Sequence, residues 1–257
     1  MPRLAGAAAH GTDAFPGAAA AYVVRVDGAP LWEADADRPL PPASLTKLMT
    51  ALLVAAHGDE RDEVAISARA ARAGGARLGV AAGQRFRVGD LLAALLLRSA
   101  NDACVALAEH VAGSERAFVA QMNERARAMG LARTRFANAC GFDAPGHVSS
   151  AADLARLAEA FLAVPALARW AAAEKHAFED AGRTRRYAVA STNALLGRVE
   201  GVRGVKTGFT NRAGLCLVGY AERDGHRVLV VLLRARDRWW DAVAMIEQAF
   251  ARAGEKR

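Results

Sequence analysis

The amino-acid sequence predicts an α+β fold in which both ends of the chain build one antiparallel sheet and the middle forms a helical block. Two hairpin signals, Asp27-Gly28 and Asp224-Gly225, lie near opposite ends of the chain, and each is flanked by apolar, β-rich segments. Between them, residues 43–172 carry apolar side chains at helical spacing. Strands at both ends with helices between them imply a helical block inserted into one composite sheet.

The chain has 257 residues, which suits one large domain or two interleaved subdomains. We expect a single domain over residues 18–252. Its sheet part is expected at about 18–42 and 173–252, and its helical part at about 43–172. The alanine- and glycine-rich residues 1–17 are expected to be poorly structured.

The first elements follow from short local patterns. Residues 20–26 and 30–33 flank Asp27-Gly28 as the two strands of a hairpin. A proline-rich segment then leads into a helix that Gly58 can end. Ser44 falls in the first turn of this helix, and Lys47 follows one turn later on the same side.

Further helices are expected along the helical block. Residues 90–98 predict a buried helix that ends at a polar break over residues 99–102, and residues 103–111 predict the next helix. Asn101 or Asp102 is expected to cap that helix. Capping serines predict two more helices, Ser114 before residues 115–129 and Ser150 before residues 151–163.

The last part of the chain returns to strands. Residues 201–207 predict a strand, and residues 215–221 and 227–233 predict the hairpin around Asp224-Gly225. Residues 237–251 close the chain as a helix that places Val243, Ile246 and Phe250 on one face.

The formal net charge of +7 and the sequence pI of about 9.9 come almost entirely from arginine. The favoured interpretation is a solvated surface, and the alternative is attraction to an anionic polymer. No basic run is interleaved with aromatic residues, so we expect no nucleic-acid partner. The chain has four lysines, which are Lys47, Lys175, Lys206 and Lys256.

Cys104, Cys140 and Cys216 form an odd, widely spaced set, which argues against a disulfide framework and against a zinc site. Cys104 and Cys216 lie in apolar runs and are expected to be small core residues. The chain shows no convincing signal peptide, and no segment is long and apolar enough to span a membrane.

Three short motifs carry the chemistry. In Ser44-x-x-Lys47, a serine needs an adjacent base to become a nucleophile, and a lysine whose pKa is lowered can be that base. Ser99-x-Asn101 offers a hydroxyl for proton relay and an amide ligand. Lys206-Thr207-Gly208 ends a strand to which a peptide-like substrate could add. Taken singly, each motif is more often a helix cap, a turn or a solvated lysine.

In this order the three motifs form the signature of penicillin-recognising serine enzymes. The chain resembles the D-alanyl-D-alanine carboxypeptidases, which are low-molecular-mass penicillin-binding proteins, over residues 18–252. Pro42 to Thr50, Ser99 to Ala103 and Val205 to Thr210 match that family's three motif segments. The resemblance implies a β-lactamase/transpeptidase-like fold with a five-stranded antiparallel sheet.

The resemblance also implies roles for individual residues. Ser44 is expected to be the acylated nucleophile, Lys47 its base and Ser99 the relay, with the backbone N–H groups of Ser44 and Phe209 as oxyanion hole. The expected substrate-binding residues are Asn101, Lys206, Thr207, Gly208, Phe209, Thr210 and Arg238, with Arg238 beside the terminal carboxylate.

This family implies a peptidoglycan stem peptide ending in D-Ala-D-Ala as substrate, β-lactam antibiotics as covalent inhibitors, an extracytoplasmic location, and no cofactor or metal. The chain departs from the family at Phe142, commonly leucine, and at Cys140, commonly histidine. We interpret both as packing changes, and His147 as structural.

Three alternatives stay open. A D,D-endopeptidase would use the same residues on cross-linked stems. A β-lactamase usually needs a deacylating glutamate, and residues 110–200 contain no convincing Glu-x-x-x-Asn segment. A wall-binding module would keep the pocket without turnover, against which the intact Ser44 and Lys47 argue.

Overall fold

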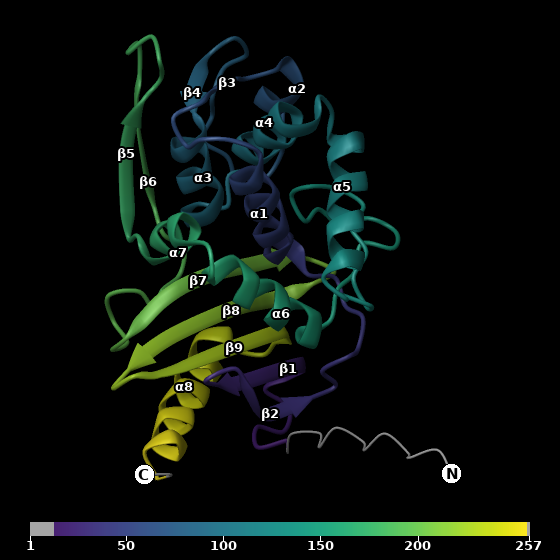
Figure 1. The fold of residues 1–257 in the computed structure, drawn as a ribbon, viewed down its shortest axis with the longest axis vertical. Coiled ribbons are helices and arrows are strands. Elements are labelled where there is room, and N and C mark those ends of the chain that lie inside the picture. Colours follow the sequence, from purple (N-terminus) through teal and green to yellow (C-terminus); the bar gives the residue numbers. More distant parts are fainter. Residues whose placement is uncertain (1–12, 256–257) are drawn as a thin grey trace.

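A computed structural model describes residues 13–255 and shows a five-stranded antiparallel sheet covered by helices on both faces (Figure 1). The strand order is β2-β1-β9-β8-β7, so the two ends of the chain meet where β1 pairs with β9. This confirms the predicted composite sheet. The strands are β1 Ala19–Val26, β2 Ala29–Ala34, β7 Val202–Thr210, β8 Gly214–Arg223 and β9 His226–Ala235.

Alternation along the strands gives the sheet two apolar faces. On β1, Val23 belongs to the core shared with the helical block, whereas Tyr22 and Val24 belong to a second core. Successive strand residues point to opposite faces, which explains this division. The second core is closed by α8 (Arg238–Gly254), capped by Asp237, whose side chain accepts hydrogen bonds from the backbone N–H groups of Trp239 and Trp240.

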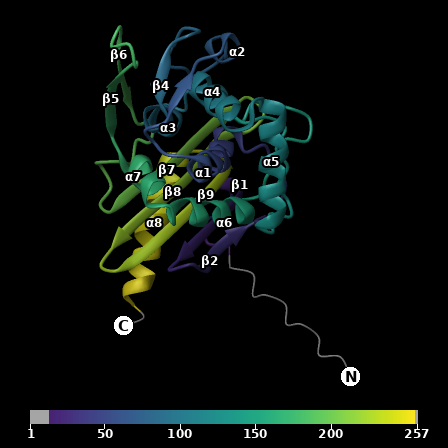
Figure 2. The ribbon, with the colours of Figure 1, turned by 45° about the horizontal axis from the view of Figure 1, so that its top comes forward.

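The helical block lies on the other face of the sheet (Figures 1 and 2). Helix α6 packs against β1 and β9, and α1 passes through the middle of the block. The helices of the block are α1 Lys47–His57, α2 Ala68–Ala71, α3 Val88–Leu97, α4 Asn101–Ala112, α5 Glu115–Ala128, α6 Ala151–Leu162 and α7 Pro165–Ala172. In the described part of the chain, no helix combines the length and apolar character needed to cross a membrane.

Two small two-stranded sheets were not predicted as such. Strands β3 (Glu63–Ala65) and β4 (Arg85–Arg87) pair inside the block that the sequence predicted to be helical apart from loops, so that prediction is wrong there. Each strand has three residues and one buried side chain, which is too short to show an alternating pattern. Strands β5 (Lys175–Glu179) and β6 (Arg186–Ala190) pair only with each other, beside the helical block (Figure 2).

The predicted serine caps of α5 and α6 are confirmed, since Ser114 and Ser150 accept from the backbone N–H groups of Ala117 and Asp153. The predicted cap of α4 is wrong. Its N-cap is Ala100, whose side chain makes no capping hydrogen bond.

The reason is that the predicted capping residues serve other partners from inside the first turn of α4. Asp102 accepts hydrogen bonds from the backbone N–H groups of Leu78 and Gly79, at 3.0 and 2.8 Å. Asn101 reaches Lys47 instead.

The start of the chain was predicted to be poorly structured over residues 1–17, of which residues 1–12 lie outside the described part. Within residues 13–17, the Asp13 carboxylate accepts a hydrogen bond of 2.7 Å from the Tyr22 hydroxyl. The Phe15 ring stands edge-on to the rings of Tyr22 and Trp32. Phe15 therefore packs onto the face of the sheet that α8 covers.

Candidate active site

Ser44 lies in a short 3₁₀ turn, η1 (Ala43–Thr46), directly before α1. The sequence placed it in the first turn of the α-helix, and the structure adds this tighter turn. Ala43 adopts a positive φ of 48°, and the Thr46 hydroxyl donates to its carbonyl at 2.8 Å. A hydrogen bond within the turn thus stabilises it, and Ser44 stays partly exposed beside a pocket.

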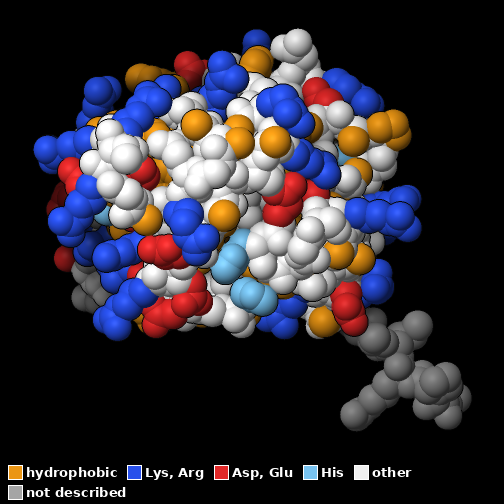
Figure 3. Space-filling model, turned by 90° about the horizontal axis from the view of Figure 1, so that it is seen from above, with side chains coloured by type: hydrophobic (Ala, Val, Ile, Leu, Met, Phe, Trp, Pro, Cys, Tyr) orange, Lys and Arg blue, Asp and Glu red, His pale blue; other side chains and the backbone are white. Residues whose placement is uncertain are grey.

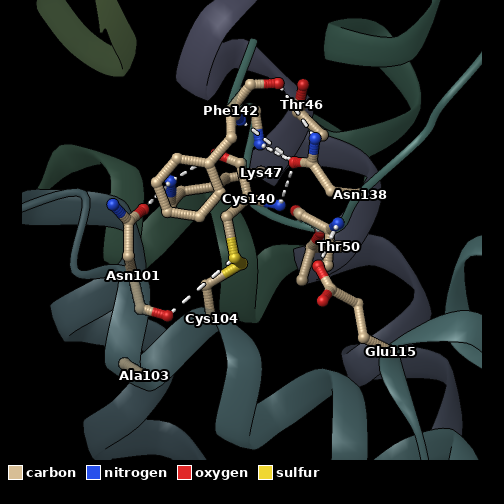
Figure 4. The surroundings of a disulfide bond; sticks show 12 residues. Thr46, Lys47, Thr50, Asn101, Ala103, Cys104, Glu115, Asn138, Cys140 and Phe142 are labelled. Atoms are coloured by element: carbon tan, nitrogen blue, oxygen red, sulfur yellow. Dashed lines mark hydrogen bonds between the residues drawn. A yellow bond between two sulfur atoms is a disulfide. The ribbon is translucent and has the colours of Figure 1, made fainter. Parts of the chain in front are cut away.

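Lys47 is fully buried, and its Nζ donates to three oxygens, of which Figure 4 shows those of Asn101 and Cys140. The acceptors are Ser44 Oγ at 3.0 Å, Asn101 Oδ1 at 2.8 Å and the Cys140 carbonyl at 2.6 Å. A lysine ammonium has three hydrogens, so these three acceptors use all of them; the neutral amine has two hydrogens and a lone pair that can face the Ser44 hydroxyl. Two of these acceptors direct the side chain, and the third is the hydroxyl of the candidate nucleophile.

The two motif lysines have lowered pKa values. Burial, and then the positive charge of Lys206, hold the pKa of Lys47 well below its usual value. Burial, and then the charge of Arg238, lower the pKa of Lys206 to about 7. A buried amine with a lowered pKa can be neutral near neutral pH, which is the state in which it accepts a proton.

Ser99 and Asn101 lie at the break between α3 and α4. Ser99 has a positive φ of 62°, and its Oγ is buried with no hydrogen-bond partner in the described structure. A buried orphan hydroxyl costs free energy unless a ligand completes it. The amide of Asn101 donates to the Gly74 carbonyl at 2.8 Å while its Oδ1 holds Lys47, so this residue joins the 74–79 loop to the site.

Strand β7 passes next to the Ser44 turn, and Gly208 allows that approach. A Cβ on Gly208 would lie 3.1 Å from Ala43 Cβ and 3.2 Å from Ser44 N. The glycine of the third motif therefore has a packing reason in the chain itself, besides any ligand. On the same strand, the Thr207 hydroxyl pairs with that of Thr192 at 2.8 Å, and Lys206 Nζ donates to the Thr207 carbonyl.

A pocket of about 360 Å³ opens beside Ser44. It brings together all of the predicted site residues except Lys47 and Lys206, which are buried and are not part of its lining. Sequence reasoning missed Thr192 and Arg98, which stand outside the three motifs and carry no local signal. The lining residues are Ser44, Gly75, Ala76, Arg98, Ser99, Asn101, Cys140, Gly141, Phe142, Thr192, Thr207, Gly208, Phe209, Thr210 and Arg238.

Arg238 reaches the pocket from the start of α8. Its Nη1 donates to the Gly208 carbonyl at 2.9 Å, and its buried Nε has no partner in the described structure. Its neighbours Arg234 and Arg236 are exposed and do not line the pocket. Over the face in Figure 3, lysine and arginine side chains are interspersed with acidic ones, as expected for a solvated surface.

Two aromatic rings stand at the mouth of the pocket. Phe209 is 59% exposed and Phe142 39% exposed, and both line the pocket. Phe142 is therefore a pocket residue and not the packing change that the sequence suggested. Thr210, also predicted in the site, donates to the Asp143 carboxylate at 2.7 Å.

His147 is structural, as expected. Its Nδ1 accepts from the backbone N–H of Ala137 at 2.9 Å, which leaves Nε2 to donate to Thr46 Oγ1 at 2.8 Å. Burial lowers its pKa to about 4. A neutral imidazole thus supports the 3₁₀ turn that carries Ser44.

The argument against a disulfide is wrong, whereas the expected burial of Cys104 and Cys216 in the core is confirmed. Cys104 and Cys140 form a disulfide, and Cys216 is a buried free thiol whose pKa burial raises to about 11. The two bonded residues lie 36 positions apart, and their Cα atoms are 5.9 Å apart. Cys140 is therefore a cross-link and not a packing change.

The chain matches known proteins along most of its length. A family model described as D-alanyl-D-alanine carboxypeptidase matches residues 12–237. The carboxypeptidase DacF of Bacillus subtilis is 32% identical over 90% of this chain and 61% of its own length, and DacC of Escherichia coli is 35% identical over 81% and 54%. A D-alanyl-D-alanine endopeptidase of Pseudomonas aeruginosa is 36% identical over 74% and 62%. The chain thus spans about half to three fifths of these relatives.

Solved structures agree in fold. The Streptomyces K15 DD-transpeptidase superposes with a TM-score of 0.86 at 25% identity, covering 95% of this chain and all of that one. Penicillin-binding protein D2 of Listeria monocytogenes, in its ampicillin-bound form, gives a TM-score of 0.79 at 32% identity, covering 91% and 97%.

Proposed function

This chain belongs to the D-alanyl-D-alanine carboxypeptidase family, and we propose that it is a serine D,D-carboxypeptidase of peptidoglycan stem pentapeptides. The observation that carries the proposal is the contact between Lys47 Nζ and Ser44 Oγ at the edge of a pocket that a strand borders. A nucleophile, a desolvated base and a strand for a peptide meet there.

Acylation begins with neutral Lys47 taking the proton of Ser44 Oγ. The oxygen attacks the carbonyl of the penultimate D-Ala, and the negative charge that develops is held by the backbone N–H groups of Ser44 and Phe209. Ser99 Oγ then gives its proton to the amine of the terminal D-Ala and receives the proton that Lys47 took from Ser44, and the amine leaves as the C–N bond breaks. Water hydrolyses the acyl-enzyme and restores the Ser44 hydroxyl.

Substrate binding uses the β7 edge. The stem peptide lies along Lys206 to Thr210 by main-chain hydrogen bonds, with Asn101 as a further ligand. Thr207 and Arg238 face the terminal carboxylate, and Lys206 contributes positive charge from its buried position on β7. The unpartnered Nε of Arg238 and Oγ of Ser99 support this assignment, because buried polar groups are ordinarily hydrogen-bonded.

A β-lactam mimics the D-Ala-D-Ala amide and acylates Ser44 in the same way. The Listeria relative is recorded with ampicillin bound, which favours this expectation for the chain. A substrate of this class is found outside the cytoplasmic membrane, so we propose an extracytoplasmic site of action.

The test is incubation with a pentapeptide ending in D-Ala-D-Ala. We expect release of D-Ala by the wild type and none above background by Ser44→Ala. Equal release by both, or none by either, would overturn the proposal. A fluorescent penicillin that leaves Ser44 unlabelled would indicate a wall-binding module without turnover.

A D,D-endopeptidase is the second candidate, favoured by the Pseudomonas aeruginosa relative. The same residues would cut the cross-link between two stems. Purified cross-linked muropeptides test this, because faster cleavage of the cross-link than of the pentapeptide terminus would favour the endopeptidase.

Rapid turnover of penicillin is not expected. Among the described residues that line the pocket, none is Asp or Glu, so the lining itself offers no carboxylate to activate a deacylating water. We therefore expect a long-lived adduct on Ser44. Mass spectrometry after brief exposure to penicillin follows its decay, and loss within seconds would favour a β-lactamase.

A further inference from the structure

The Cys104–Cys140 disulfide joins the two segments that hold Lys47 (Figure 4). Cys104 lies on α4, one turn after Asn101, whose Oδ1 accepts from Lys47 Nζ. Cys140 itself supplies the second acceptor through its backbone carbonyl. Both cysteines are at most 1% exposed. One covalent bond therefore joins the two segments that carry the Asn101 Oδ1 and Cys140 carbonyl acceptors of Lys47.

The other contacts of the 138–142 loop point elsewhere. Thr50 on α1 donates to the Ala139 carbonyl at 2.6 Å, and Glu115 on α5 accepts from the Ala139 N–H at 3.0 Å. Asn138 Oδ1 accepts from the loop's own Gly141 N–H at 2.7 Å. These bonds tie the loop to α1, to α5 and to itself. Besides the disulfide, Cys140 meets α4 through a long contact of 3.9 Å between its Sγ and the Asn101 carbonyl, and a sulfur in a disulfide has no hydrogen to donate there.

The same loop also contacts the nucleophile's turn. A Cβ on Gly141 would lie 2.9 Å from Ser44 N and would overlap the Ala43 carbonyl. A shift of the loop therefore displaces the turn that carries Ser44, as well as the carbonyl that accepts from Lys47.

We propose that the Cys104–Cys140 disulfide is a positioning element for acylation, which sets the spacing of Asn101 Oδ1 and the Cys140 carbonyl and so directs Lys47 at Ser44. The inference rests on the proposed function of Ser44 and Lys47. It makes Cys104 and Cys140 positioning residues, since neither side chain touches the reacting atoms.

Loss of the bond has a specific chemical consequence. The two acceptors become free to move apart, and water reaches the amine that burial now keeps dry. Since burial is the first cause of the lowered pKa of Lys47, that pKa then rises. A smaller fraction of the amine is neutral at pH 7, and acylation slows even where penicillin still binds.

The experiment measures the acylation rate constant and the dissociation constant of a fluorescent penicillin separately, from pH 5 to 10. It compares the wild type with Cys104→Ala and Cys140→Ala, both of which keep the Cys140 carbonyl. Cys216→Ala, which removes the buried free thiol of β8, is the matched control. Alkylation of the unfolded, unreduced wild type should modify only Cys216.

We expect the acylation rate constant of both disulfide variants to fall about ten-fold or more at pH 7, since small misplacements of a catalytic group cost that much. The pH at which the acylation rate constant increases should be higher in both disulfide variants than in the wild type. The Cys216→Ala variant should keep the wild-type pH profile. Wild-type rates and profiles in the disulfide variants would overturn the inference, as would alkylation of all three cysteines.

Reduction of the wild type keeps the test independent of variant folding. A small dithiol gives up two electrons and two protons and becomes a cyclic disulfide, while the S–S bond breaks into the Cys104 and Cys140 thiols. Labelling should slow on reduction and recover after reoxidation. Unchanged labelling of fully reduced protein contradicts the inference alone, whereas a wild type that never labels overturns the proposed function as well.

Discussion

The Nζ of Lys47 lies 3.0 Å from the Oγ of Ser44, and the lysine side chain is completely buried. The serine is partly exposed at the pocket, so the pair spans the boundary between solvent and core. Burial keeps the amine's pKa low, and exposure lets the hydroxyl meet a substrate.

Replacement of Lys47 by methionine should remove the base and keep most of the packing volume. We expect the rate constant of acylation by penicillin to fall by roughly 10²–10⁴-fold, the usual contribution of a positioned base. Stopped-flow labelling measures it. Lys175→Met is the control, because Lys175 is exposed on β5. A Lys47→Met rate near that of the control would show that another group takes the proton.

Removal of the charge of Lys206 should move the pH profile of acylation upward. The positive charge of Lys206 disfavours the protonated form of Lys47 and lowers its pKa. In Lys206→Gln the pKa of Lys47 is higher, so the acylation rate reaches half of its plateau at higher pH. The measurement is the acylation rate constant from pH 5 to 10, and a midpoint that stays or falls contradicts the assignment.

His147 should make the protein less stable in acid. Its pKa is about 4 in the folded state and near 6.5 in the unfolded state. The unfolded chain thus takes up a proton below pH 6.5 that the folded chain refuses until about pH 4. The contribution of neutral His147 to the free energy of unfolding is complete above pH 6.5. It falls by about 3 kcal/mol in all as the pH is lowered to 4.

Urea unfolding at pH 7.5 and 4.5 tests this contribution. The wild type should lose about 2–3 kcal/mol more than His147→Gln between the two pH values. His57→Gln, at the exposed end of α1, should lose as much as the wild type. Equal losses in all three proteins would refute the role of His147.

Gly208→Ala should impair acylation and leave the fold intact. The new methyl group would lie 3.2 Å from Ser44 N, so strand and turn must separate by a few tenths of an ångström. Misplacement of that size near the nucleophile should reduce the acylation rate constant about ten-fold or more. Gly219→Ala, on the neighbouring strand β8, meets nothing closer than 3.8 Å and should label normally. Equal labelling of both variants would mean that the approach is not critical.

Arg238→Met should weaken binding of the D-Ala-D-Ala peptide more than it slows turnover. We expect KM to rise about ten-fold or more, because a charged hydrogen bond to the carboxylate is lost. Arg236→Met, two residues away, removes an exposed charge that does not line the pocket and should leave KM unchanged. Steady-state D-Ala release measures both constants, and a similar KM in the two variants would remove Arg238 from the carboxylate site.

Much of the fold could be predicted because its signals are local. The turns at Asp27-Gly28 and Asp224-Gly225, the caps Ser114 and Ser150, and the helical spacing of apolar residues each act over a few positions. The sequence did not reveal strands β3 and β4, since three residues carry no readable period. The cap of α4 failed because tertiary partners, Lys47 among them, took up the side chain of Asn101.

The sequence by itself determined which chemical groups the site has, their order along the chain and the elements that carry them. Only the tertiary structure decided how Lys47 is held, because its acceptors come from positions 44, 101 and 140. It also decided that Cys104 bonds to Cys140, against the expectation from their spacing. The physical reason is that local patterns encode periodicity and caps, whereas the desolvation of an amine and the meeting of distant residues depend on the packing of the whole domain.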